Sequence, residues 1–280
     1  MKIGIVGLGL IGGSLAKSIQ KNTQHQVYGI DNDDSTMAKA KMMGAIEGPL
    51  ERSKIPEMDL LLLAIYPETT LPYLMEISPL ISKGTLVMDL CGVKEEICRE
   101  AFPLAQEKGF HFIGGHPMAG IEFSGFDASQ ISLFSNASMI LVPPAQIPIS
   151  KLEFVKNLFL SLGFGHIEIS TPEKHDRIIA LSSQLAHVVS SAYVQSPQAM
   201  QHKGYSAGSF HDMTRVAKLN EELWSQLFFF NQQNLLEEID GLIHRLTEYR
   251  DAIREKDENG LKELLSQGRK RRVELEEVSE

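Results

Sequence analysis

One histidine stands between a pair of glycines and a proline, in the stretch FIGGHPMAG at residues 112–120. Pro117 has no N–H group and disfavours the helical conformation at His116, while Gly114 and Gly115 permit positive φ angles and close approach of another molecule. These neighbours predict that His116 lies on a shaped, exposed loop. An imidazole there could transfer a proton near neutral pH, although a solvent-facing histidine on a turn would show the same pattern.

A second stretch, GLGLIG, places glycines at positions 7, 9 and 12, between an apolar run and a helical pattern. This is the context of a dinucleotide-binding loop. Gly7 would make the tight turn, Gly9 would let a pyrophosphate approach, and Gly12 would allow the helix to pack closely on the strand. The residues expected to contact the cofactor are Gly7, Leu8, Gly9, Leu10, Ile11, Gly12, Asp31 and Ile65.

An acidic residue, Asp31, ends the second apolar run, roughly twenty residues after Gly12. Its carboxylate could accept hydrogen bonds from the ribose hydroxyls of the adenosine half of the cofactor. Asn32, Asp33 and Asp34 follow, and none of them could neutralise a 2′-phosphate. The expected cofactor is therefore NAD rather than NADP.

The elements that would position these residues alternate in the first half of the chain. Short apolar runs separated by helical patterns predict a doubly wound parallel sheet of the Rossmann type. The expected strands lie in the segments 2–8, 26–31, 58–67, 85–92, 110–117, 137–144 and 165–170.

After Thr171 every pattern is helical. We therefore expect a Rossmann-type domain over residues 1–171 and an all-helical domain over residues 172–280. Near the end of the chain one apolar stripe recurs at helical spacing, which predicts a homodimer formed through the C-terminal helices. The stripe consists of Leu235, Ile239, Leu242, Leu246, Tyr249 and Ile253.

Composition narrows the possible partners. The 27 Lys and Arg against 36 Asp and Glu leave a net charge of −9, which argues against nucleic acid and anionic membrane surfaces. Cys91 and Cys98 offer neither a disulfide framework nor zinc-ligand spacing, so no metal is expected and reduced thiols favour the cytoplasm. No apolar run is long enough to span a bilayer.

Taken together, the segments GLGLIGGS, DLCGVK, GGHPMAG and SFHDMTRVAKLNEELW resemble the prephenate/arogenate dehydrogenase family of tyrosine biosynthesis. The resemblance covers nearly the whole chain and implies the catalytic core without a chorismate mutase or ACT domain. It implies NAD-dependent oxidative decarboxylation of prephenate to 4-hydroxyphenylpyruvate. Arogenate, which carries an amino acid in place of the keto acid side chain, is the alternative substrate.

The resemblance also implies roles for individual residues. His116 would be the catalytic base that takes the proton of the substrate's C4 hydroxyl. Arg215 would hold the ring carboxylate, plausibly as a bidentate pair, although it could instead pair with Asp212 on the surface. His187 and Ser183 would line the substrate site, although a lone histidine on an apolar helix face could equally be a core residue.

Three departures from the family pattern bear on substrate choice more than on reaction type. Gly92 stands where relatives often have a serine that positions the substrate hydroxyl and the histidine, so Cys91 or a water would have to substitute. Gln184 and Ala186 replace the first histidine and the proline of an S-H-L-P-H pattern. Ile121 follows HPMAG where threonine or serine is common.

Two other interpretations remain open at this point. A different β-hydroxyacid dehydrogenase-like enzyme would rely on a lysine in the helical domain, whereas the helix expected over residues 173–195 has His187 at its middle and Lys174 near its start. A non-catalytic dinucleotide-sensing protein would keep the glycine loop but would have no reason to keep both His116 and Arg215.

Overall fold

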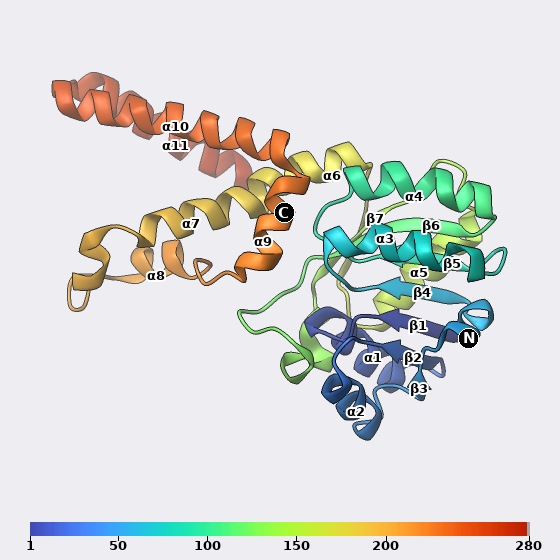
Figure 1. Ribbon diagram of the computed structural model, residues 1–280. Helices are drawn as coiled ribbons and strands as arrows, with labels where there is room; N and C mark the ends of the chain where they lie inside the picture. The colour runs from blue at the N-terminus through green and yellow to red at the C-terminus, as the bar shows by residue number, and fades with distance from the viewer. Residues whose placement is uncertain (279–280) are drawn as a thin grey trace. The chain divides into compact units, whose positions relative to one another are not determined.

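The computed structural model describes residues 1–278. An eight-stranded sheet in the order β3-β2-β1-β4-β5-β6-β7-β8 forms the centre of the N-terminal part (Figure 1). The strands are β1 (Lys2–Val6), β2 (Gln26–Ile30), β3 (Gly48–Pro49), β4 (Leu60–Leu63), β5 (Leu86–Asp89), β6 (His111–Pro117), β7 (Ser138–Val142) and β8 (His166–Ile169). All seven predicted strands are present, and the two-residue β3 adds an eighth at the edge.

Neighbouring strands run parallel, except that β6 and β7 pair antiparallel. The sequence predicted a parallel sheet and did not distinguish this reversal. The buried runs β4 and β5 have no exposed residue, as expected for central strands covered on both faces.

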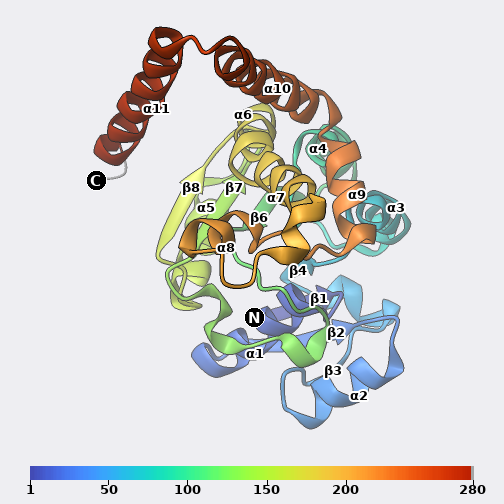
Figure 2. The same cartoon turned by 90° about the vertical axis from the view of Figure 1, so that its left-hand side faces the viewer.

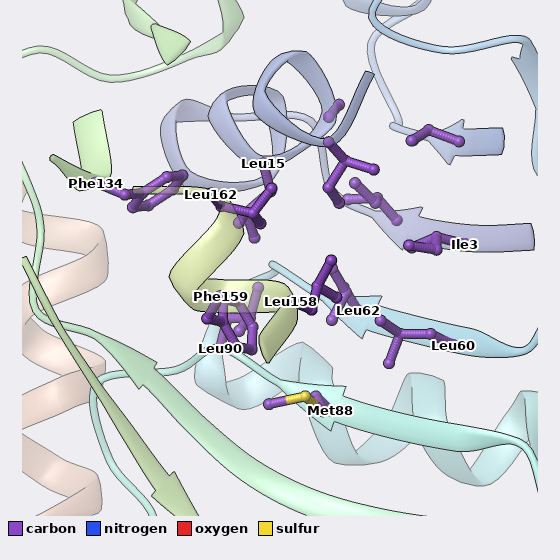
Figure 3. Packing of buried hydrophobic residues seen from close by; sticks show 14 of the residues in the cluster. Ile3, Leu15, Leu60, Leu62, Met88, Leu90, Phe134, Leu158, Phe159 and Leu162 are labelled. Atoms are coloured by element: carbon purple, nitrogen blue, oxygen red, sulfur yellow. The ribbon is translucent and has the colours of Figure 1, made fainter. Parts of the chain in front are cut away.

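Helices cover both faces of the sheet. One face packs against α1 (Leu10–Asn22), α2 (Asp34–Met42) and α5 (Ile149–Ser161), and the other against α3 (Pro67–Ile77) and α4 (Glu95–Lys108). Figure 3 shows the first face, where Leu15 of α1 and Leu158 of α5 lie over Leu62 of β4. This arrangement confirms the predicted doubly wound fold.

Beyond β8 the described chain is helical (Figure 2). Its helices are α6 (Pro172–Ile179), α7 (Ala186–Val194), α8 (Gly208–Thr214), α9 (Glu221–Phe230), α10 (Gln232–Glu255) and α11 (Glu258–Val278). A π-helical turn, Ala180–Leu185, joins α6 to α7. Asn220 caps the start of α9, because its side chain accepts a hydrogen bond from the backbone N–H of Leu223.

The chain divides into two compact units, Met1–Gln232 and Gln233–Glu280, the second built from α10 and α11. The predicted boundary at residue 171 falls within the first unit, where strands give way to helices. The division into 1–171 and 172–280 stays a prediction, and its last two residues lie outside the described part of the chain. Among the helices of residues 1–278, none is long and apolar enough to cross a bilayer.

Candidate active site

The carboxyl ends of four parallel strands bring the predicted cofactor loop and the predicted base to one edge of the sheet. Gly7 follows β1, Ile65 follows β4, Gly92 follows β5, and His116 lies near the end of β6. The strand order reverses between β1 and β4, since β2 leads away on one side and β5 on the other. Ligands of doubly wound sheets bind at such a point.

The glycine loop has the geometry that its sequence predicts. Gly7 has a φ of +84°, and a Cβ there would lie 2.4 Å from the carbonyl oxygen of Ala64. A Cβ on Gly12 would lie 1.9 Å from the carbonyl oxygen of Gly7, so a side chain is excluded. A Cβ on Gly9 would meet nothing within 4 Å. Gly9 therefore leaves open space at the start of α1, where a phosphate group can approach backbone N–H groups.

Asp31 and Ile65 lie against the same loop. The carboxylate of Asp31 accepts hydrogen bonds from the backbone N–H of Leu8 (2.7 Å) and of Asp33 (3.0 Å). Ile65 is so close that its Cγ2 would lie 2.8 Å from a Cβ on Gly7. Leu10 and Ile11 begin α1 directly after Gly9. The predicted cofactor-binding residues thus form one continuous loop and its supports.

The prediction of an exposed loop around His116 is wrong, whereas the strand predicted over residues 110–117 is confirmed. His116 is the sixth residue of β6, pairs with Ile140 of β7 and is half-buried. Gly114 and Gly115 do not have positive φ angles. Glycine is needed at both positions because neighbouring atoms leave no space for a side chain. A Cβ on Gly114 would lie 3.0 Å from Cδ of Lys94, and one on Gly115 would lie 2.8 Å from the carbonyl oxygen of Asp89.

A chain of hydrogen bonds orients the His116 ring. His116 Nδ1 lies 2.9 Å from Nε2 of His175, and His175 Nδ1 lies 2.6 Å from the carboxylate of Asp176. Asp176 also accepts the backbone N–H groups of Lys94 and Glu95, both at 2.8 Å. Because a carboxylate only accepts, His175 carries its proton on Nδ1 and accepts at Nε2. His116 then donates from Nδ1, which leaves its Nε2 without a proton and able to accept one.

Burial and nearby positive charge keep this pair neutral. Burial, the charge of His175 and the charge of Lys94 together hold the pKa of His116 well below its ordinary value of 6.5. Burial also lowers the pKa of His175, although its bond to Asp176 opposes the shift. Lys94 and Asp89 form a fully buried ion pair, and the charge of Lys94 acts on both histidines. Burial disfavours the charge on Lys94, yet Asp89 beside it leaves the pKa of Lys94 raised.

The predicted substrate-binding residues lie in the π-helical turn (Ser183), on α7 (His187) and at the end of α8 (Arg215). The ring of His187 in α7 meets Trp224 of α9 edge to face, with centroids 3.8 Å apart. Burial and the charge of Arg215 lower the pKa of His187 to about 4. Arg215 is exposed at the end of α8 and, within residues 1–278, has no ion pair with Asp212.

His187 also has an unsatisfied polar atom. Its buried Nδ1 has no hydrogen-bond partner among the described residues, an arrangement that costs free energy unless a ligand supplies the bond. Ser183 lies half-exposed in the π-helical turn, one turn before His187. Such turns inside helices are frequent at functional sites.

The structure explains two of the sequence departures. Gln184 is buried; its amide nitrogen donates to the carbonyl oxygen of Leu227, and its oxygen accepts from Asn231, both at 2.8 Å. It therefore fastens the π-helical turn to α9. Cys91 does not replace the absent serine, because its Sγ contacts the Thr70 hydroxyl (3.2 Å) and the Ile65 carbonyl oxygen (3.5 Å). Burial raises the pKa of this thiol to about 12. Nothing in the structure explains Ile121 or Ala186.

Sequence reasoning missed His175 and Asp176. They stand side by side in the first turns of α6, and both are almost completely buried, at 2% and 0% exposure. The only local signal was an acid next to a histidine directly after the last strand. Their importance comes from a contact with His116, which lies 59 positions earlier in the chain.

Comparisons with known proteins agree with this site. A family model described as "Prephenate dehydrogenase, nucleotide-binding domain" matches residues 15–168, and one described as "Prephenate dehydrogenase, dimerization domain" matches residues 171–267. The prephenate dehydrogenase of Bacillus subtilis is 30% identical over 266 residues, which cover 92% of this chain and 71% of the relative.

Two solved structures share the fold over almost the entire chain. The prephenate dehydrogenase of A. aeolicus in complex with hydroxyphenyl propionate and NAD+ is 29% identical, with a TM-score of 0.85 and 98% of each chain covered. The arogenate dehydrogenase of Synechocystis is also 29% identical, with a TM-score of 0.81, 98% of this chain and 100% of that chain covered.

A Rossmann-type dinucleotide loop beside a buried histidine pair defines a dehydrogenase site, and the family matches extend over both halves of the chain. The chain belongs to the prephenate dehydrogenase family.

Proposed function

We propose that this chain catalyses the NAD-dependent oxidative decarboxylation of prephenate to 4-hydroxyphenylpyruvate. The observation that carries the proposal is the unprotonated Nε2 of His116, held by His175 and Asp176 at the strand ends that also carry the glycine loop. The names of the relative in B. subtilis and of the A. aeolicus structure support the substrate.

The residues present fit NAD. Gly9 leaves the space that a pyrophosphate needs, and Asp31 stands at the loop with Asn32 and Asp33 after it, where a 2′-phosphate would meet negative charge. Leu8, Leu10, Ile11 and Ile65 would complete the cofactor site. When bound, NAD supplies the oxidant that accepts a hydride from C4 of the substrate.

His116 would act as the base for the C4 hydroxyl. Its Nε2 accepts the hydroxyl proton as the carbon is oxidised, and the resulting positive charge is shared with His175 through Nδ1. The carboxylate of Asp176 stabilises that charge from the far side of His175. Carbon dioxide then leaves C1 of the substrate and the ring becomes aromatic.

Arg215, His187 and Ser183 would bind the substrate. Prephenate carries two carboxylates, and Arg215 is an exposed cation without an ion pair among residues 1–278, whose charge acts on His187. A planar guanidinium can hold a carboxylate through two parallel hydrogen bonds. The unpartnered Nδ1 of His187 could bond a second polar group of the substrate.

Arogenate is the second candidate substrate. The Synechocystis arogenate dehydrogenase matches this chain at the same 29% identity as the A. aeolicus prephenate dehydrogenase. The two substrates share the ring, its carboxylate and the C4 hydroxyl, so the proposed roles of His116 and Arg215 are the same for both.

We also propose that the chain acts as a homodimer in the cytoplasm. Matching of residues 171–267 to a dimerization domain supports the dimer, as do apolar side chains of α10 that are more than half exposed in the single chain, Ile243, Leu246 and Ile253. The two cysteines are free and buried, which is usual for proteins of reducing compartments.

The test is an assay of cofactor reduction with prephenate and arogenate, each paired with NAD and NADP, for the natural protein and for His116→Asn. We expect NAD reduction with prephenate, and a loss of kcat on the order of 10²- to 10⁴-fold in the variant with NAD binding unchanged. Undiminished turnover in His116→Asn would overturn the assignment of the base. A preference for NADP would contradict the role of Asp31.

A further inference from the structure

Leu227 of α9 closes one side of the space in front of His116. The leucine is 8% exposed. A Cβ added to Gly92 would lie 3.1 Å from Cδ2 and 3.7 Å from Cδ1 of Leu227, and 3.7 Å from Nε2 of His116. One small volume beside Gly92 is therefore bounded by the leucine methyl groups and by the nitrogen that accepts the proton.

The constraint on position 92 is the small space around it, and its backbone conformation does not require glycine. Its φ lies outside the left-handed region, so an L-residue could adopt the same conformation. A Cβ at position 92 would be in tight contact with the Cδ2 methyl group of Leu227, at 3.1 Å. A side chain there would require Leu227 to move.

The position of Leu227 is held by the network that orients the base. Its carbonyl oxygen accepts from Gln184, whose own oxygen accepts from Asn231. Asn231 also donates to the carbonyl oxygen of Asp176 at 2.8 Å, and the carboxylate of Asp176 orients His175. Leu227 and His116 are thus both linked to Asp176: the leucine to its backbone carbonyl through Gln184 and Asn231, and His116 to its carboxylate through His175.

We propose that Leu227 is a positioning residue of the reaction: its side chain keeps water away from the Gly92 side of His116 Nε2, so that the substrate hydroxyl becomes the hydrogen-bonding partner of that nitrogen. The inference rests on the proposed function of His116 as the base. It also links two departures from the family pattern, because Gly92 leaves room for the leucine side chain and Gln184 holds the leucine backbone.

The entry of water beside His116 would change the pKa of its ring, and this change can be measured. His175 and Lys94 both act on its ring and remain in place in a leucine variant. Water at Nε2 would relieve the burial that contributes most to the low pKa of His116. The acidic limb of kcat/KM would then move to higher pH, because the pKa of His116 would rise toward its ordinary value of 6.5. If Leu227 contributed only to stability, the acidic limb would not move.

The experiment compares Leu227→Ala, Gly92→Ser and the double variant, with Leu160→Ala as the matched control on the exposed surface of α5. We expect Leu227→Ala to lower kcat about tenfold, leave the KM for NAD unchanged and shift the acidic limb upward. Gly92→Ser should also lower kcat, because its Cβ meets Leu227. The double variant should be more active than either single variant, since the serine fits the vacated volume.

Two outcomes would overturn the inference: an acidic limb in Leu227→Ala that coincides with that of the natural protein, or losses that multiply in the double variant. Leu227→Val serves the same comparison if the alanine variant does not fold. Failure of the proposed function is a different result, because it would appear as inactivity of the natural protein or as activity that survives His116→Asn.

Discussion

At the scale of the residue, the chemistry depends on which nitrogen of His116 lacks a proton. The hydrogen bonds determine the tautomer of this ring, because Asp176 accepts a hydrogen bond from His175 and His175 accepts one from Nδ1 of His116. The order of these three groups directs the basic Nε2 away from the network. Leu227 covers the Gly92 side of this nitrogen, which leaves its remaining side for a substrate hydroxyl.

This environment predicts the pH dependence of catalysis. A protonated His116 cannot accept the hydroxyl proton, so kcat/KM falls as pH drops through its pKa. Burial and the charges of His175 and Lys94 place that pKa well below 6.5, and we therefore expect full activity at pH 6.5 and an acidic limb below it. The measurement is kcat/KM between about pH 4.5 and 8, with circular dichroism to show that the protein stays folded. An inflection at or above pH 6.5 would contradict this account.

At the scale of the element, the connection between β5 and α4 supports the site through a buried charge. Lys94 precedes α4, and its ammonium group meets Asp89 at the end of β5 with both side chains at 0% exposure. The absence of a side chain at Gly114 of β6 makes room for the lysine stem. The pair thus joins β5, β6 and the start of α4.

Removing one partner of this pair should destabilise the protein strongly. In Lys94→Met the carboxylate of Asp89 stays buried without its cation, so the free energy of unfolding should fall by about 3 to 5 kcal/mol. The double variant Lys94→Met/Asp89→Leu should recover most of the loss, because it removes both charges. Urea denaturation of the three proteins measures the effect. Equal destabilisation of the single and double variants would show that packing rather than charge is responsible.

At the scale of the whole molecule, the helical unit Gln233–Glu280 contains apolar surface that one chain does not cover. Ile243, Leu246 and Ile253 of α10 are 55%, 57% and 62% exposed. Their spacing of three or seven residues places them on one stripe of the helix. A second copy of the chain would bury such a stripe.

A charge on this stripe should separate the proposed dimer. We expect Leu246→Glu to give a monomer in light scattering, at a concentration where the natural protein is dimeric, because the carboxylate would be buried without a partner. His244→Glu is the matched control, since it places the same charge about 200° around the helix. A dimer that persists in Leu246→Glu would place the interface elsewhere.

The sequence by itself determined the order of elements, the cofactor loop and the class of chemistry. Apolar runs of strand length and the spacing of Gly7, Gly9 and Gly12 are local patterns, and each is sufficient to predict its own element. That His116 and Arg215 belong to one site was indicated only by the resemblance to a family. Neither the reversal of β7 nor the π-helical turn had a local signal.

Only the tertiary structure decided what surrounds the base. It brought His175 and Asp176 onto the ring of His116 and set Leu227 against Gly92. These contacts join segments that are far apart in the sequence, so no periodicity or composition reports them. The physical reason is that hydrogen bonding and burial, which decide the tautomer and the pKa of an imidazole, belong to its neighbours in space and not to its neighbours in the chain.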